Sequence, residues 1–236
     1  MKFILRRKKE SRPQEPQTKK ARIWAHFKSL ASTIVFVWFF TNHVAQATVV
    51  PTESMLPTIL AGDHFFLDKV AFPANYPEAL REFLPERTIR RGDIVAFWSP
   101  EKPGLRLVKR AIALPGDTFE IQEGDVYIND QILKESYAVH RLPPARWRSE
   151  NVAPMTIPPD QFFMMGDNRD ESHDSRIFGV IHRDALIGKP TFVYWSYASE
   201  PYQGSRTLKE WAEYYGSIAM HFVTRTRWAR TGTVLQ

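Results

Sequence analysis

The stretch Leu107-Val-Lys-Arg-Ala-Ile-Ala-Leu114 is apolar apart from two cations and runs into the turn Pro115-Gly-Asp117. Successive side chains of a β-strand point to opposite faces. Read as a strand, the stretch puts Lys109 on one face and Arg110 on the other, each among apolar neighbours. We therefore expect a β-strand that carries one cation on each face.

Similar short segments, separated by turn residues, recur along the chain after residue 50. This spacing, with few helical stretches, predicts a mainly β domain. The pair Thr118–Ile121 and Val126–Ile128, joined by Gln122-Glu-Gly-Asp125, predicts a β-hairpin. The expected strands are His64–Phe72, Asp93–Ser99, Leu105–Leu114, Thr118–Ile121, Val126–Ile128, Gln161–Met165, Ile177–Ile181 and Thr191–Tyr197.

Three segments do not fit this pattern of strands. We interpret residues 73–91 and the proline-containing residues 134–159 as insertions at the surface. Near the C-terminus, apolar residues at helical spacing predict a short helix with one face packed on the β domain, and contact with a membrane surface is the alternative. These residues are Leu208, Trp211, Tyr215, Ile218 and Phe222.

Positive charge is concentrated at the N-terminus of the chain. Residues 1–28 hold ten Lys/Arg and two Glu, a net charge of +8, whereas the whole chain carries +6, which leaves −2 for residues 29–236. The body is therefore nearly neutral, and we expect no nucleic-acid binding. The absence of cysteine excludes disulfides, thiolate metal sites and cysteine nucleophiles.

The most apolar segment runs from Leu30 to Val50, enough for a helix of about 31 Å, or one bilayer core. As an anchor, residues 29–50 leave the basic tail 1–28 in the cytoplasm and the domain 51–236 outside. As a cleavable signal peptide, the segment offers Ala45-Gln46-Ala47, a small-x-small cleavage pattern. The long basic tail favours the anchor.

The ionisable residues narrow the possible chemistry. The sequence has no nucleophile elbow, phosphate loop or HExxH zinc motif. The acid-rich run that begins at Gly166 is no calcium loop, because its third, sixth and twelfth positions counted from Asp167 are Arg169, Ser172 and Phe178. We expect neither a metal nor a cofactor.

Ser54 and Lys109 remain as candidates for catalysis. A lysine in apolar surroundings can lose its proton, which an arginine cannot, and a neutral lysine activates a nearby serine hydroxyl. Pro51 and Pro57 stiffen the chain on either side of Ser54. The plainer alternative is that Lys109 reaches water at a sheet edge and that Ser54 is a turn serine.

Together these motifs resemble the type I signal peptidases over residues 30 to 200. The matching blocks are Pro51-Thr-Glu-Ser-Met-Leu-Pro-Thr58 with Gly62-Asp63, Arg91-Gly-Asp-Ile-Val-Ala-Phe97, Val108-Lys-Arg-Ala-Ile-Ala-Leu-Pro-Gly-Asp117 and Gly166-Asp-Asn-Arg-Asp-Glu-Ser-His-Asp-Ser-Arg176. The resemblance implies a β domain of antiparallel sheets with an N-terminal transmembrane helix. It also implies a serine endopeptidase that removes N-terminal signal peptides from exported preproteins.

The resemblance implies a role for each matching position of a Ser–Lys dyad. Ser54 would be the nucleophile and Lys109 its general base. The backbone N–H of Ser54 and the hydroxyl of Thr52 would form the oxyanion hole, although the family more often has serine at the second position. Ser172 would hydrogen-bond Lys109, and the neighbouring Glu171 is often asparagine in relatives.

The remaining implied sites are structural or contact the substrate. Asp174 and Arg176 would form a structural ion pair. Shallow apolar pockets would receive the small substrate residues at positions −1 and −3. The residues expected to line them are Val50, Pro51, Met55, Leu107 and Val108. The expected location is the inner (cytoplasmic) membrane as a single-pass protein with its catalytic domain outside, and the expected partners are preproteins, the lipid bilayer and the export translocon.

Three alternatives stay open at this point. A Ser54–His173–Asp174 triad would replace lysine by histidine as the base. A self-cleaving regulator would use the same Ser–Lys chemistry, but such proteins are cytoplasmic, which the apolar segment argues against. A non-catalytic exported β domain would bind extended peptides by strand addition.

Overall fold

The computed structural model describes residues 18–235, except for 71, 73–74, 78, 80–82, 84–86, 149 and 203–206. Parts of the predicted insertion at 73–91, namely 73–74, 78, 80–82 and 84–86, and most of the basic tail therefore lie outside the described residues. The chain divides into two compact units, Met1–Phe39 and Phe40–Gln236.

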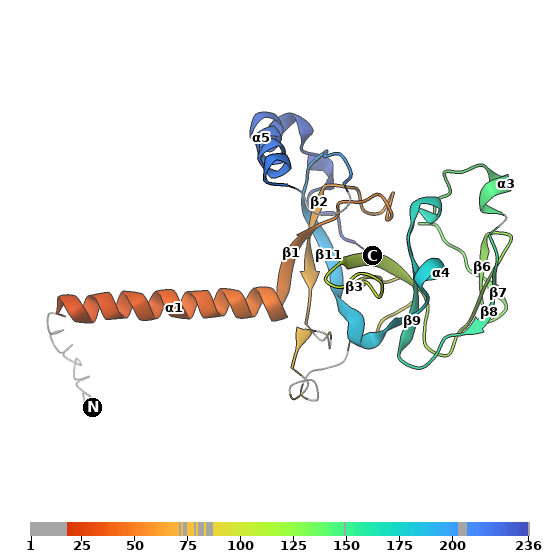
Figure 1. The fold of residues 1–236 in the computed structure, drawn as a ribbon, viewed down its shortest axis with the longest axis horizontal. Helices are drawn as coiled ribbons and strands as arrows, with labels where there is room; N and C mark the ends of the chain where they lie inside the picture. The colour runs from red at the N-terminus through yellow and green to blue at the C-terminus, as the bar shows by residue number, and fades with distance from the viewer. Residues whose placement is uncertain are drawn as a thin grey trace, which may run out of the picture. The chain divides into compact units, whose positions relative to one another are not determined.

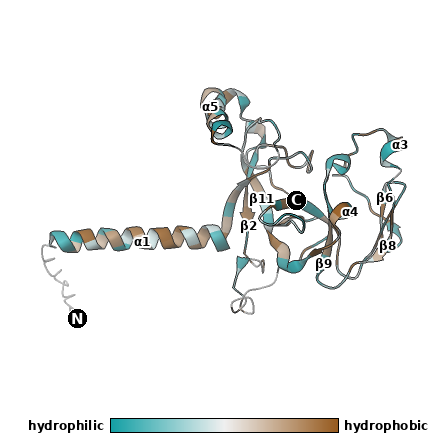
Figure 2. Ribbon diagram, viewed as in Figure 1, coloured by the Kyte–Doolittle hydropathy of each residue, from teal (hydrophilic) through white to brown (hydrophobic). Residues whose placement is uncertain are grey.

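The N-terminal helix α1 runs from Lys19 to His43 and has no buried residues. By length and composition it can cross a membrane, and its middle is the most apolar part (Figure 2). The expected helix from Leu30 to Val50 was wrong at both ends, because the helix starts earlier and stops at His43. Ala45–Val49 instead forms strand β1, whose β-branched Thr48 and Val49 favour a strand.

The second unit is built from two antiparallel sheets (Figure 1), as expected for a mainly β domain. The seven-stranded sheet contains, in spatial order, β1 (Ala45–Val49), β2 (Asp63–Asp68), β11 (Leu186–Ser196), β3 (Ile94–Trp98), β4 (Arg106–Ala113), β9 (Gln161–Met165) and β10 (Ile181–His182). The four-stranded sheet contains β7 (Gln131–Ile132), β6 (Asp125–Ile128), β5 (Thr118–Gln122) and β8 (Val152–Thr156). The predicted hairpin is β5–β6.

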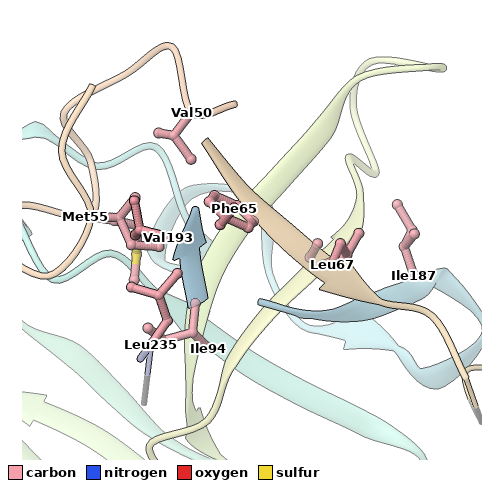
Figure 3. Packing of buried hydrophobic residues seen from close by; sticks show 10 residues of the cluster. Val50, Met55, Phe65, Leu67, Ile94, Ile187, Val193 and Leu235 are labelled. Carbon is pink, nitrogen blue, oxygen red and sulfur yellow. The ribbon is translucent and has the colours of Figure 1, made fainter. Parts of the chain in front are cut away.

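Strand β4 lies inside the larger sheet, between β3 and β9. Three clusters of buried apolar residues pack around the sheets. The first joins the segment after β1 to β2, β3 and β11, and Figure 3 shows Met55 and Leu235 within it. The third joins the two sheets, with the rings of Phe119 and Phe163 stacked at 4.0 Å.

Two local predictions need correction. Residues Ile177–Ile181 do not form a strand, since helix α4 (Ser175–Phe178) comes first and β10 starts at Ile181. The Asp174 side chain accepts a hydrogen bond from the Arg176 backbone N–H, which caps that helix. The segment 134–159 is not only an insertion, because it contains helix α3 (Pro144–Trp147) and strand β8.

The C-terminal helix α5 (Leu208–Arg225) begins with a capping box formed by Thr207 and Glu210. Its half-buried side includes Trp211, but Leu208 is 90% exposed, so the predicted single apolar face is only partly packed. The short 3-10 helices are η2 (Arg169–Glu171), η3 (Arg183–Ala185) and η4 (Trp228–Arg230). After η4 the chain returns to the sheet, where Val234 bridges to Phe192.

Candidate active site

Ser54 lies in a tight loop between β1 and β2. The two ends of the loop are tied together, because Val50 N–H donates to Asp63 O at 3.2 Å and Gly62 N–H donates to Val50 O at 2.9 Å. Met55, the residue after Ser54, is fully buried in the first core cluster. The loop is therefore anchored on both sides of Ser54.

Lys109 comes from the middle of β4, opposite Val95 of β3. It is 3% exposed, and its Nζ lies 2.5 Å from Ser54 Oγ. Burial is the main cause that lowers the pKa of Lys109 from 10.5 to about 8. A lysine with this pKa is partly neutral near neutral pH, so its Nζ can accept a proton from the hydroxyl beside it.

The segment after β9 packs directly against the backbone of Ser54. Asn168 N–H donates to Ser54 O at 3.2 Å, and Asn168 Nδ2 donates to Glu53 O at 3.2 Å. A Cβ on Gly166 would lie 2.5 Å from Ser54 O and 2.2 Å from Ser172 Oγ. Only glycine fits at this close approach.

Asp174 and Arg176 form an ion pair that holds the same segment. Arg176 Nη2 donates to Asp174 Oδ2 at 2.8 Å, and Gly166 N–H donates to the same oxygen at 2.9 Å. Burial opposes the ionisation of Asp174, but Arg176, the Gly166 N–H and the Ser172 hydroxyl together outweigh it and hold the pKa of Asp174 below its usual value. Arg176 also binds Glu150 at 2.9 Å.

Two further candidates lie near the Ser54–Lys109 contact. Thr52 is close to it along the chain, and Ser172 is close to it in space. Thr52 is half-buried in the Ser54 loop, two residues before the serine. Ser172 Oγ is buried beside Gly166 and makes no hydrogen bond of good geometry among the described residues, although its interaction with the Asp174 carboxylate helps to lower the pKa of Asp174. The expected hydrogen bond between Ser172 and Lys109 is thus not formed here, because the hydroxyl faces the Gly166 backbone.

Comparison with known proteins assigns the chain to a family. The family model described as "Signal peptidase, peptidase S26" matches residues 23–195. The chain is 33% identical to "Signal peptidase I" of Leptolyngbya laminosa over 71% of this chain and 77% of the relative. It is 30% identical to "Signal peptidase I P" of Bacillus subtilis subsp. natto over 77% of this chain and 93% of the relative. The chain belongs to the signal peptidase family, peptidase S26.

A solved signal peptidase I from Enterococcus faecalis matches 44% of this chain and 97% of its own, with 35% identity and a TM-score of 0.36. Signal peptidases of this family are serine endopeptidases that cleave signal peptides, and the present chain is an enzyme of that class. Their membrane anchoring fits the one N-terminal apolar helix described above.

The alternative triad through His173 is excluded by the geometry of this signal peptidase. His173 Nε2 lies 2.6 Å from Glu101 Oε2 at the surface, and the His173 side chain is 56% exposed. Asp174 is directed to Arg176 and not to the histidine ring. The two residues therefore cannot act together on Ser54. Within the described ranges, no group of three or more His, Asp or Glu side chains is placed to hold a metal ion.

The five predicted pocket residues do not lie on one surface of the signal peptidase domain. Val50 and Met55 are buried in the first core cluster, with Val108 packed against it. Leu107 packs against a different cluster, because neighbouring residues of β4 face opposite sides of the sheet. Pro51 is half-buried, and its carbonyl accepts the N–H of Tyr202 at 2.9 Å.

A support for the Ser54 loop that the sequence did not reveal comes from the C-terminus. Arg230 Nη2 donates to Thr58 O at 2.9 Å and to Asp63 Oδ2 at 2.5 Å. Asp63 is fully buried and also accepts the Ser196 hydroxyl at 2.6 Å. Gly62-Asp63 was noted as a motif, but nothing in the local pattern around Arg230 indicates a partner 167 residues away.

Proposed function

We propose that this chain is a membrane-anchored serine endopeptidase that removes N-terminal signal peptides from exported preproteins by a Ser54–Lys109 dyad. The observation that carries the proposal is the 2.5 Å contact between Ser54 Oγ and the Nζ of a lysine that is 3% exposed. No other described nucleophile has a base with a lowered pKa at such a distance. Membership of the signal peptidase family supports the substrate class.

In the first half of the reaction, neutral Lys109 accepts the proton of Ser54 Oγ while this oxygen attacks the scissile carbonyl carbon. The resulting oxyanion accepts hydrogen bonds from the Ser54 backbone N–H and the Thr52 hydroxyl. Collapse of the tetrahedral intermediate breaks the C–N bond and leaves an acyl-enzyme. The Lys109 ammonium returns its proton to the departing amine, which becomes the N-terminus of the mature protein.

In the second half, a water molecule gives its proton to neutral Lys109 and attacks the ester carbon. Breaking the ester bond returns the proton from Lys109 to Ser54 Oγ and releases the signal peptide as a carboxylic acid. We propose that Ser172 orients Lys109 during these transfers. What supports this role is the position of Ser172 Oγ beside Gly166, in the segment that packs against the backbone of Ser54.

The proposed anchor is α1, with the basic residues before it in the cytoplasm and the catalytic domain outside the cytoplasmic membrane. The signal-peptide alternative is less favourable, because Ala45-Gln46-Ala47 lies in β1, fully paired with β2. Small substrate residues at −1 and −3 are assigned to apolar surface beside Lys109, on the face of β4 that Leu107 shares. The lipid bilayer and the export translocon are the proposed partners.

The test uses the full chain in detergent and a preprotein with Ala-x-Ala before its cleavage site. We expect wild type to release the mature protein and Ser54→Ala to be inactive. His173→Ala serves as the matched control, because this exposed histidine pairs with Glu101, and it should retain activity. Equal processing of the preprotein by wild type and Ser54→Ala would contradict the proposal.

A further inference from the structure

Three charged side chains from different parts of the chain gather next to Ser54. Arg141 Nη1 lies 3.6 Å from Glu53 Oε2 and 3.6 Å from Glu171 Oε2. Glu53 precedes the serine in the loop, Arg141 comes from the 134–159 segment, and Glu171 ends η2. We call these three residues the charge cluster. Their side chains are 40%, 47% and 52% exposed, respectively, so substrate can approach them.

The backbone that carries Arg141 is held in place. Asp170, in η2, accepts the N–H of Arg141 at 2.5 Å and that of Leu142 at 2.6 Å. The preceding His140 lies 3.1 Å from Asp170 through its Nδ1, and its ring stacks on Trp147 of α3 at 4.2 Å. The 134–159 segment therefore holds the Arg141 guanidinium next to Glu53 of the Ser54 loop.

Asn168 contacts both acidic residues, Glu53 through its backbone carbonyl and Glu171 through its carboxylate. This buried side chain donates through Nδ2 to Glu53 O at 3.2 Å and to Glu171 Oε2 at 3.1 Å. The charge cluster is thus fixed beside the nucleophile by the residue whose N–H also binds Ser54 O. Its position follows from the packing of the site and not from chance surface contacts.

The charge cluster contributes little to folding but changes the local charge. Ion pairs this exposed are worth little, since solvent screens them. The two carboxylates and one guanidinium of the charge cluster carry a net charge of −1, and Glu53 is the residue next to Ser54. Exposed charges act over about 8 Å, which is one Debye length at physiological salt. Charged substrate residues at this distance are attracted or repelled.

We propose that Glu53, Arg141 and Glu171 set a charge preference for the substrate residues just after the scissile bond. Acidic residues at +1 and +2 are disfavoured, and basic residues are favoured. The pockets proposed for the residues before the bond involve β4, whereas no member of the charge cluster comes from β3 or β4. The inference rests on the proposed function, because it requires Ser54 to mark the cleavage point.

The experiment compares three preproteins that differ only at +2, where they carry Lys, Gln or Glu. The full chain in detergent should cleave the Lys preprotein with a kcat/KM about threefold to tenfold above that of the Glu preprotein at low salt. Half-molar NaCl should reduce this ratio toward one, because salt screens exposed charges. The same residues placed at −2 should give a ratio near one.

Two variants should move the Lys/Glu ratio in opposite directions. Arg141→Gln leaves a net charge of −2 and should raise the ratio, whereas Glu171→Lys leaves +1 and should invert it. A loss of structure would lower the cleavage of all three preproteins together and could not produce opposite shifts. Glu101→Gln removes an exposed carboxylate outside the charge cluster and should leave the ratio unchanged.

The outcomes separate this inference from the proposed function. In one outcome, wild type cleaves the Gln preprotein, Ser54→Ala does not, and all variants of the charge cluster share one Lys/Glu ratio. This outcome would overturn only the charge preference. In another outcome, the variants change the Lys/Glu ratio of preproteins that carry the charge at −2 and not of those that carry it at +2. This outcome would overturn the assignment to the residues after the bond. Processing by Ser54→Ala at the wild-type rate would overturn the proposed function itself.

Discussion

Each face of β4 buries one cation, and the two cations have different partners. Lys109 and Arg110 are neighbours, and each is 3% exposed. Arg110 is paired with the buried Asp167 through two hydrogen bonds of 2.8 and 2.7 Å, and its guanidinium lies 4.0 Å from the ring centroid of Tyr137. Lys109 has no carboxylate within ion-pair distance in the described part of the chain, and it faces the hydroxyl of Ser54.

The difference shows that burial alone does not decide whether a cation keeps its proton. Arginine stays charged at any usable pH, so its burial requires a permanent counter-charge such as Asp167. Lysine can release its proton, and without an adjacent carboxylate its burial favours the neutral amine. One strand therefore supplies a structural cation on one face and a candidate base on the other.

Replacing Lys109 by a residue that cannot accept a proton should have the largest effect on kcat/KM. Lys109→Arg keeps a long cationic side chain but cannot accept a proton, so we expect kcat/KM to fall by about 10³-fold or more. Preprotein processing by the full chain in detergent measures the loss. Lys102→Arg, at an exposed position before β4, is the control and should process normally. Substantial activity in Lys109→Arg would remove lysine as the base.

Removing the cation from the arginine face should instead damage the fold. Arg110→Met leaves Asp167 buried without its guanidinium, and we expect the free energy of unfolding to fall by about 3–5 kcal/mol. Urea unfolding in detergent micelles measures the change. Lys209→Met breaks an exposed pair with Glu213 and should cost less than about 0.5 kcal/mol. A similar small loss for both variants would show that Arg110 is not needed as a counter-charge.

The alternation of β4 could be predicted from sequence because it depends only on neighbouring residues. Strand β9 was predicted with its exact bounds for the same reason. The strand Ala45–Val49 was missed because it directly follows the helix and was counted as the end of a single apolar segment. The strand predicted at Ile177–Ile181 failed because the capping interaction of Asp174 starts a helical turn there.

The site depended on contacts that no local pattern reveals. The meeting of Ser54 with Lys109 joins residues 55 positions apart; their chemistry made them candidates, but their pairing was specified by the family resemblance. The Arg230–Asp63 pair and the charge cluster were not expected at all, because both depend on how distant loops pack. Leu107 and Val108 were both expected to line the pockets because they are neighbours in sequence, but they face opposite sides of the sheet and pack against different clusters.

The pH dependence of cleavage should reveal the proton state of the lysine face. With a pKa of about 8, the neutral fraction of Lys109 rises from about 1% at pH 6 to about 50% at pH 8. We therefore expect kcat/KM to increase about fiftyfold over this range. Rate profiles for wild type and His173→Ala should coincide, because the exposed histidine has no contact with Ser54. A profile that changes in His173→Ala would identify histidine as the titrating group.

The smallest expected effect is a gain in stability when the lysine charge is removed. In the folded state the pKa of Lys109 is about 8, below the 10.5 of the unfolded chain, so the unfolded state binds the proton more tightly. Below pH 8 the folded state therefore carries a penalty of about 3 kcal/mol, which declines as the pH rises from 8 to 10.5. Lys109→Met removes this penalty and loses about 1 kcal/mol for the contact with Ser54.

We thus expect Lys109→Met to be inactive and yet more stable than wild type by about 2 kcal/mol at pH 7, with the gain lost above pH 10.5. Urea unfolding at pH 7 and pH 10.5 measures both quantities, and Lys102→Met, which removes an exposed lysine, should show no such gain. A stability loss in Lys109→Met at pH 7, like that expected for Arg110→Met, would mean that both faces of β4 hold charged cations. An inactive but stabilised variant would show that Lys109 serves catalysis although it lowers the stability of the fold.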